Sequence, residues 1–127
     1  MNEVEKMYEN CNIKPKQEGY CGWDSNCPYP HHKCNDECPY WKYKDIAEYP
    51  PFTAEKQIEL IKWLCINTYR NYLLFRYNFT NNYWQVECNM IDSNKELVFS
   101  NALASIINNL WQDLTKDEQE QIREILK

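Results

Sequence analysis

The strongest chemical signal in this sequence is a group of four cysteines near its N-terminus. Cys21, Cys27, Cys34 and Cys38 follow one another with the spacing C-x5-C-x6-C-x3-C. Zinc prefers four sulfur or imidazole ligands at the corners of a tetrahedron, and such a site can supply much of the folding free energy of a short segment. We therefore predict a structural zinc ion held by these four thiolates.

Three further residues are reserve ligands for this ion: His31, His32 and Cys11. The simpler interpretation of the two histidines is that they are surface imidazoles. The segment lacks the C-x2-C pair that most zinc modules contain, so disulfides, free thiols and an iron–sulfur cluster stay open as alternatives.

A catalytic zinc site would need an open coordination position and a general base. Asp36 and Glu37 are near enough in sequence to supply that base, which makes a zinc hydrolase one hypothesis. The H-x-E and P-C-x-x-C pattern of zinc deaminases is absent, and so is the H-E-x-x-H pattern. Solvated loop acids are the simpler interpretation of both residues, so we predict no catalytic residue.

Composition argues against several classes of protein. Two glycines among 127 residues leave no glycine-rich phosphate loop or dinucleotide motif. The formal net charge is -5 and both halves are acidic, which weighs against direct nucleic-acid binding. The first residues form no apolar signal peptide, and no apolar run has the length of a membrane helix. We expect a cytoplasmic protein without membrane contact, where reduced thiols favour zinc over disulfides.

The cysteine cluster belongs to a segment without clear periodicity. Residues 11–51 show neither a helical nor an alternating pattern for long enough to form a regular element. Pro50-Pro51 marks a boundary, because a proline disfavours the helical conformation of the residue before it. We predict a loop-dominated, zinc-knuckle-like module over residues 1–51 and a separate α+β domain over residues 52–127.

The predicted domain begins with a helix that Thr53 can cap. Its apolar residues recur at helical spacing and are expected to face the core; they are Ile58, Ile61, Leu64 and Cys65. Cys65 is therefore expected to be a small buried hydrophobic residue, and the same is expected of Cys88 on a later strand.

A β-hairpin is expected next, because the apolar period changes to two. A two-residue turn at Asn81-Asn82 would pair Phe79 with Trp84 and Arg76 with Glu87. One face would then be apolar throughout, with Leu73, Phe75, Tyr77 and Phe79 opposite Met90, Cys88, Val86 and Trp84.

After a turn at Asp92-Ser93-Asn94, a third strand is predicted from Glu96 to Phe99. Ser100 is expected to cap one helix, and Thr115 with Glu118 forms a capping-box pattern for a last one. The apolar positions of these helices are Ala102, Leu103, Ile106, Ile107, Leu110, Trp111, Leu114, Ile122, Ile125 and Leu126. The predicted fold class is α+β: a three-stranded antiparallel meander with helices packed on one face, in the order α-β-β-β-α-α.

Aromatic side chains predict a surface for binding a protein partner, because Tyr, Trp and Arg are favoured at interfaces. The candidate residues come from the module and from the outer face of the hairpin; they are Trp23, Tyr40, Trp41, Tyr72, Arg76 and Tyr83. The alternative is that the aromatic side chains of the module cover this outer face and join the two parts of the chain.

Residues 52–127 resemble the small "ABA sandwich" proteins of phages and prophages. The resemblance rests on the helix before the hairpin, on the strand Trp84-Gln-Val-Glu-Cys88, and on Asn101-Ala-Leu-Ala-Ser-Ile-Ile107 leading into Leu110-Trp111. It does not include the cysteine-rich module. The resemblance implies a fold and a phage or prophage origin, and it brings no catalytic residues.

Three functions are compatible with these features. The first is a non-enzymatic interaction protein with a structural zinc module, which the resemblance extends to a phage-encoded inhibitor of a host defence system, such as an anti-CRISPR, acting in the cytoplasm of a bacterial host. The second is a small-molecule binder that sequesters a nucleotide signal between sheet and helices, using Arg70 or Arg76. The third is the zinc hydrolase.

Overall fold

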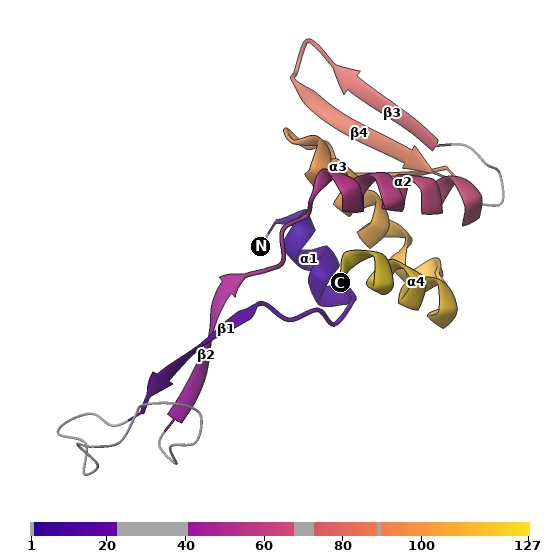
Figure 1. Cartoon of the computed structure of the whole chain (residues 1–127). Coiled ribbons are helices and arrows are strands. Elements are labelled where there is room, and N and C mark those ends of the chain that lie inside the picture. The colour runs from indigo at the N-terminus through magenta and orange to yellow at the C-terminus, as the bar shows by residue number, and fades with distance from the viewer. Residues whose placement is uncertain (1, 23–40, 68–72, 89) are drawn as a thin grey trace. The chain divides into compact units, whose positions relative to one another are not determined.

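The computed structural model describes residues 2–22, 41–67, 73–88 and 90–127. Its chain is of the mixed α+β class and divides into two compact units. One unit, which we call the helical unit, consists of Met1–Lys14 and Pro51–Lys127, and the other, the hairpin unit, consists of Pro15–Pro50 (Figure 1).

The hairpin unit contains two antiparallel strands, β1 (Lys16–Cys21) and β2 (Trp41–Glu48). The prediction that residues 11–51 form no regular element is therefore wrong for both ends of this segment. The two strands pair segments that are distant in sequence, and neither segment alone carries a signal for that pairing. In the ladder Cys21 lies opposite Trp41, so the two ends of the cysteine-rich segment meet.

Helix α1 (Glu3–Asn10) was not expected from the sequence. Asn2 caps it, since its side-chain oxygen accepts a hydrogen bond of 2.8 Å from the Glu5 amide. Met7 and Tyr8 are fully buried, and the helix packs on helix α3 of the helical unit. The division of the chain thus differs from the predicted one, which assigns residues 1–14 to the cysteine-rich module.

Helix α3 (Phe99–Leu110) lies at the centre of the helical unit, in contact with α1, β4 and β5. Its predicted apolar face is confirmed at Ala102, Leu103, Ile106 and Ile107, which are fully buried, whereas Leu114 is half-buried. Ala104 and Ser105, which were not predicted for this face, are fully buried too. The expected cap at Ser100 is wrong, because the helix begins after Val98 without a side-chain cap. A 3-10 helix, η1 (Trp111–Asp113), follows directly.

The last helix, α4 (Lys116–Leu126), carries the predicted capping box. The Thr115 amide donates to Glu118 at 3.0 Å and the Glu118 amide donates to the Thr115 hydroxyl at 3.2 Å. Ile122 and Leu126 are fully buried, as expected, whereas Ile125 is half-buried.

Helix α2 (Ala54–Asn67) is capped by Thr53, as predicted, but buries a different face. Leu60, Trp63 and Leu64 are buried, whereas Ile58 is 50% exposed and Cys65 is exposed. The expected burial of Cys65 is therefore wrong. The reason is that α2 packs on α4, where the Trp63 indole donates a 2.7 Å hydrogen bond to Gln121.

The sheet of the helical unit is the predicted antiparallel meander, β3 (Leu73–Asn78), β4 (Tyr83–Cys88) and β5 (Ile91–Asp92). The order α-β-β-β-α-α is confirmed for residues 52–127. The third strand is not where it was expected: Glu96 makes only an isolated bridge with Trp84, and Phe99 already belongs to α3.

The hairpin register differs from the predicted one by two residues, because Tyr77 rather than Phe79 lies opposite Trp84. The turn has four residues, since the Asn78 side chain accepts hydrogen bonds from the amides of Thr80 (3.0 Å) and Asn81 (2.9 Å). A shift of two keeps every side chain on its predicted face. It also leaves Phe79 and Met90 outside the ladder.

Candidate interaction surface

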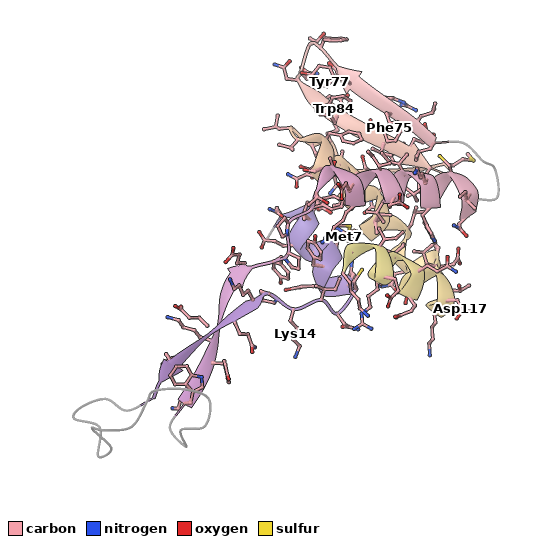
Figure 2. All side chains as sticks on the ribbon, viewed as in Figure 1. Met7, Lys14, Phe75, Tyr77, Trp84 and Asp117 are labelled. Carbon is pink, nitrogen blue, oxygen red and sulfur yellow. The ribbon has the colours of Figure 1, made fainter. Side chains whose placement is uncertain are left out.

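Five aromatic rings form a continuous series on the sheet face that contacts α3. Tyr77 is central, with its ring centroid 4.9 Å from Phe79 and 4.8 Å from Trp84. Trp84 lies 5.2 Å from Phe99, which lies 5.4 Å from Phe75. The rings meet edge-on or tilted, the favourable arrangement for aromatic pairs. Figure 2 shows Phe75, Tyr77 and Trp84 along the two strands.

Part of this series is open to solvent. Phe79 is 85% exposed, Phe75 41% and Tyr77 37%. The cause is the position of α3, which covers β4 so that Val86 and Cys88 are fully buried, but does not cover β3 equally. Burial of Cys88 confirms the prediction for that residue.

Two aliphatic residues that directly precede α3 in the sequence are exposed as well. Leu97 is 77% exposed and Val98 is 53% exposed, and Phe99 follows them directly. We call the set formed by Phe75, Tyr77, Phe79, Leu97 and Val98 the aromatic face. Its composition matches the apolar centre of a protein interface rather than an ordinary polar surface.

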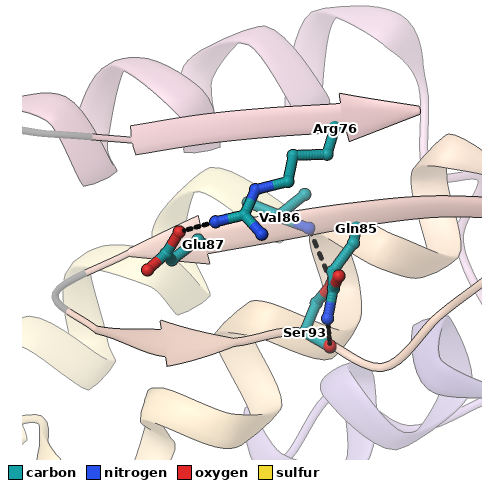
Figure 3. A network of polar contacts seen from close by, with 5 residues as sticks. All are labelled: Arg76, Gln85, Val86, Glu87 and Ser93. Atoms are coloured by element: carbon teal, nitrogen blue, oxygen red, sulfur yellow. Dashed lines mark hydrogen bonds and ion pairs between the residues drawn. The ribbon is translucent and has the colours of Figure 1, made fainter. Parts of the chain in front are cut away.

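The opposite face of the same sheet is mostly polar and engaged in contacts within the chain, although Leu74 on this face is 44% exposed. Arg76 forms a short ion pair with Glu87, and the Gln85 side chain donates to the Ser93 carbonyl at 3.3 Å (Figure 3). The ammonium group of Lys95 lies 5.1 Å from the centre of the Tyr83 ring. Arg76 and Tyr83, both predicted for the interaction surface, therefore lie on this side and not on the aromatic face.

The other predicted surface residues belong elsewhere. Trp41 is half-buried in the hairpin unit, where its ring lies against Gly19 and meets Tyr43 edge-on at 6.5 Å. Trp23, Tyr40 and Tyr72 lie outside the described residues. The aromatic face was not predicted, because helices were expected to cover the whole apolar side of the hairpin. The signal that could have found it is the apolar pair Leu97-Val98 next to a polar turn.

The predicted metal ligands are only partly within the described structure. The backbone of Cys21 ends β1, whereas Cys27, His31, His32, Cys34 and Cys38 lie outside the described residues. Asp36, Glu37 and Arg70 also lie outside them. Among residues 2–22, 41–67, 73–88 and 90–127, no group of three or more His, Cys, Asp or Glu side chains is placed to hold a metal ion.

Cys11, the reserve ligand, is buried in the helical unit at the end of α1. Burial raises the pKa of its thiol to about 12, against a lowering effect of Arg123 and a further raising effect of Glu120. Coordination of zinc by Cys11 would require this buried thiol to lose its proton. This placement argues against Cys11 as a ligand.

One carboxyl group near the sheet is also perturbed. Glu96 bridges to Trp84 through its backbone, and burial, with the nearby charge of Glu3 as a second cause, raises the pKa of its side chain. Glu3 is held by Asn108, whose side chain donates to the Glu3 carboxylate and carbonyl at 2.9 Å each. These contacts fasten α1 to α3 and offer no arrangement suited to acid–base catalysis.

Within the part of the chain that the structure describes, no helix has the length and apolar character needed to cross a bilayer. Comparison with protein-family models, with curated proteins and with solved structures found no match to this chain.

Proposed function

We propose that this chain is a non-enzymatic protein that binds another protein through its aromatic face. The observation that supports this most directly is Phe79, which is 85% exposed and lies against the partly open ring of Tyr77; Leu97 is 77% exposed as well. Exposed apolar residues that lie together, rather than singly, are characteristic of sites that bind other proteins. Aromatic side chains supply most of the binding free energy at such sites.

The apolar character of the aromatic face and the net charge of the chain indicate what kind of protein surface would bind here. The five residues of the aromatic face carry no charge, so the centre of the contact must be apolar. The chain as a whole has a formal charge of -5, and an acidic protein associates faster with a partner of basic surface. We therefore expect the partner to be a protein with an apolar patch surrounded by basic residues.

The finer parts of the proposal rest on the sequence. The resemblance of residues 52–127 to phage and prophage proteins supports an inhibitor of host defence, of the anti-CRISPR kind, as the biological role. A structural zinc ion at Cys21, Cys27, Cys34 and Cys38 would close the hairpin unit. Pairing of Cys21 with Trp41 supports this, because Cys38 comes only three residues before Trp41.

The small-molecule hypothesis that used Arg76 is not favoured, since this guanidinium is occupied by the carboxylate of Glu87 on the polar side of the sheet. No described residue favours a zinc hydrolase.

Affinity capture from a bacterial lysate with three forms of the chain tests the proposal. The wild type and an Ile66→Ser control should retain the same protein in equal amount, whereas Phe79→Ser should lose most of it. Both substitutions replace an apolar residue that is at least 77% exposed, so both variants should fold normally. Equal retention by all three forms would show that the aromatic face is not the binding site.

A further inference from the structure

A second concave site lies in the helical unit, between the C-terminal end of α1, η1 and α4. Its volume is about 250 Å³, enough for a small metabolite. The residues that matter for its chemistry are Asn10, Cys11, Trp111, Lys116, Glu120 and Arg123. Helix α1 lines this site and was not expected from the sequence, so the site could not be predicted from the sequence either.

The charged groups around the site are two cations and one anion. Lys116 and Arg123 contribute positive charge, and Glu120 contributes a negative one. Arg123 and Glu120 form only a loose ion pair, with 3.5 Å between guanidinium nitrogen and carboxylate oxygen. The site therefore has one positive charge in excess, at the edge of a protein that is acidic overall.

Within the described part of the chain, not every hydrogen-bond donor of the two cations has an acceptor. The Nε atom of Arg123 is buried and has no hydrogen-bond partner there, and a buried donor without a partner is unfavourable. The Arg123 side chain is 38% exposed, so its outer nitrogens can be reached from the site. A small rotation of the guanidinium would let Nε and one outer nitrogen grip an oxyanion side by side.

We propose that this site binds a small molecule through an oxyanion group, a phosphate or a carboxylate, with Arg123 and Lys116 as the recognising residues. The partly exposed guanidinium of Arg123 supplies two neighbouring N–H donors for the oxyanion. The ammonium group of Lys116 adds a positive charge. Trp111, which is 9% exposed, supplies an apolar wall for the body of the ligand. The site is independent of the aromatic face and of any metal in the hairpin unit.

Titration calorimetry of the whole chain with sodium phosphate and with sodium acetate, against sodium chloride at equal ionic strength, tests the proposal. Saturable binding of phosphate or acetate is expected, and the better ligand identifies the group. Arg123→Gln should weaken that binding about tenfold or more, and Lys116→Gln severalfold, because charge-assisted hydrogen bonds are lost. Lys62→Gln, which removes a lysine on α2 that pairs with Glu59, is the matched control and should bind like the wild type.

Two results would overturn the proposal. One is the absence of saturable binding of both anions to the wild type. The other is binding that Arg123→Gln and Lys116→Gln leave unchanged, which would place the anion elsewhere. If Arg123→Gln does not fold, Lys116→Gln decides the question, since Lys116 is exposed in the first turn of α4 and its loss should not affect folding.

Discussion

Two serine hydroxyls are among the few buried polar groups of the helical unit, and they fasten the end of the sheet to α3. Ser93 is 4% exposed and accepts a 2.8 Å hydrogen bond from the Val86 amide. Ser105 is fully buried and accepts one of 2.8 Å from the Asn94 amide. The loop thus makes one satisfied buried contact with β4, through Ser93, and one with α3, through Ser105.

Replacing Ser105 with alanine should lower the free energy of unfolding by about 1–3 kcal/mol, because the Asn94 amide loses its acceptor. Ser100→Ala, in the first turn of the same helix and without a capping role, should change it by less than about 0.5 kcal/mol. Urea unfolding of both variants measures the difference. Equal losses would mean that the hydrogen bond to Asn94 contributes nothing.

The buried thiol of Cys11 links stability to alkaline pH. Its pKa is raised from 9.0 to about 12 on folding, so above pH 9.0 the unfolded chain releases the proton that the folded chain keeps. The free energy of unfolding should therefore fall as the pH rises from 9.0 toward 12. Tyr8, with a pKa raised to about 12, adds to this fall.

Cys11→Ala should reduce the slope of unfolding free energy against pH in this range, while Cys65→Ala, at an exposed position, should leave it unchanged. Chemical denaturation at a series of alkaline pH values gives the slopes. A Cys11→Ala slope equal to that of the wild type would contradict burial of this thiol.

At the scale of elements, the hairpin shows what the sequence can and cannot predict. The alternation of side chains predicts the faces of β3 and β4 correctly, because a strand has a period of two whatever its partner. The register depends on the turn, and there the carboxamide of Asn78 binds two turn amides, a contact with no periodic signature. The burial of α2 was wrong for a related reason: apolar residues lie on both of its sides, and only the packing on α4 selects one.

The candidate surface was predicted even less completely. Aromatic residues on the hairpin are evident in the sequence, but which of them stay exposed depends on how far α3 extends under the sheet. The burial of helix α1 could not be predicted for the same reason. Met7 and Tyr8 become core residues only because α1 packs on α3, which is distant in sequence.

Gly19 tests the account of the hairpin unit. A Cβ atom at this position would lie 2.5 Å from Nε1 of Trp41, so the ring must turn away in Gly19→Ala. The indole N–H resonance of Trp41 should shift, and the unit should lose no more than about 1 kcal/mol, because the ring is at the end of a rotatable side chain. Lys42→Ala, which faces the other side of β2, is the control. An unchanged Trp41 resonance would contradict the contact with Gly19.

For the whole molecule, we expect metal removal to affect the hairpin unit and not the helical unit. If zinc binds Cys21, Cys27, Cys34 and Cys38, the purified chain should contain about one zinc ion under reducing conditions. Serine at any of the four should abolish binding, whereas Cys65→Ser should not. A chelator should disturb amide resonances of the hairpin unit and spare those of α3. An ordered hairpin unit in a zinc-free, reduced protein would refute the metal module.

The aromatic face raises a question about the isolated chain. The largely exposed side chains of Phe79 and Leu97 contribute little buried area to the fold itself, and the proposed contact with a partner would bury them. The same apolar residues create a risk of aggregation, which the net charge of -5 counteracts.

Hydroxyl-radical footprinting of the chain, free and bound to the captured partner, tests whether the aromatic face binds that partner. In the free chain Phe79 and Leu97 should be strongly oxidised, and in the complex their oxidation should fall severalfold, with that of Ile66 on α2 unchanged. Weak oxidation of Phe79 in the free chain, or no protection of either residue in the complex, would contradict the account.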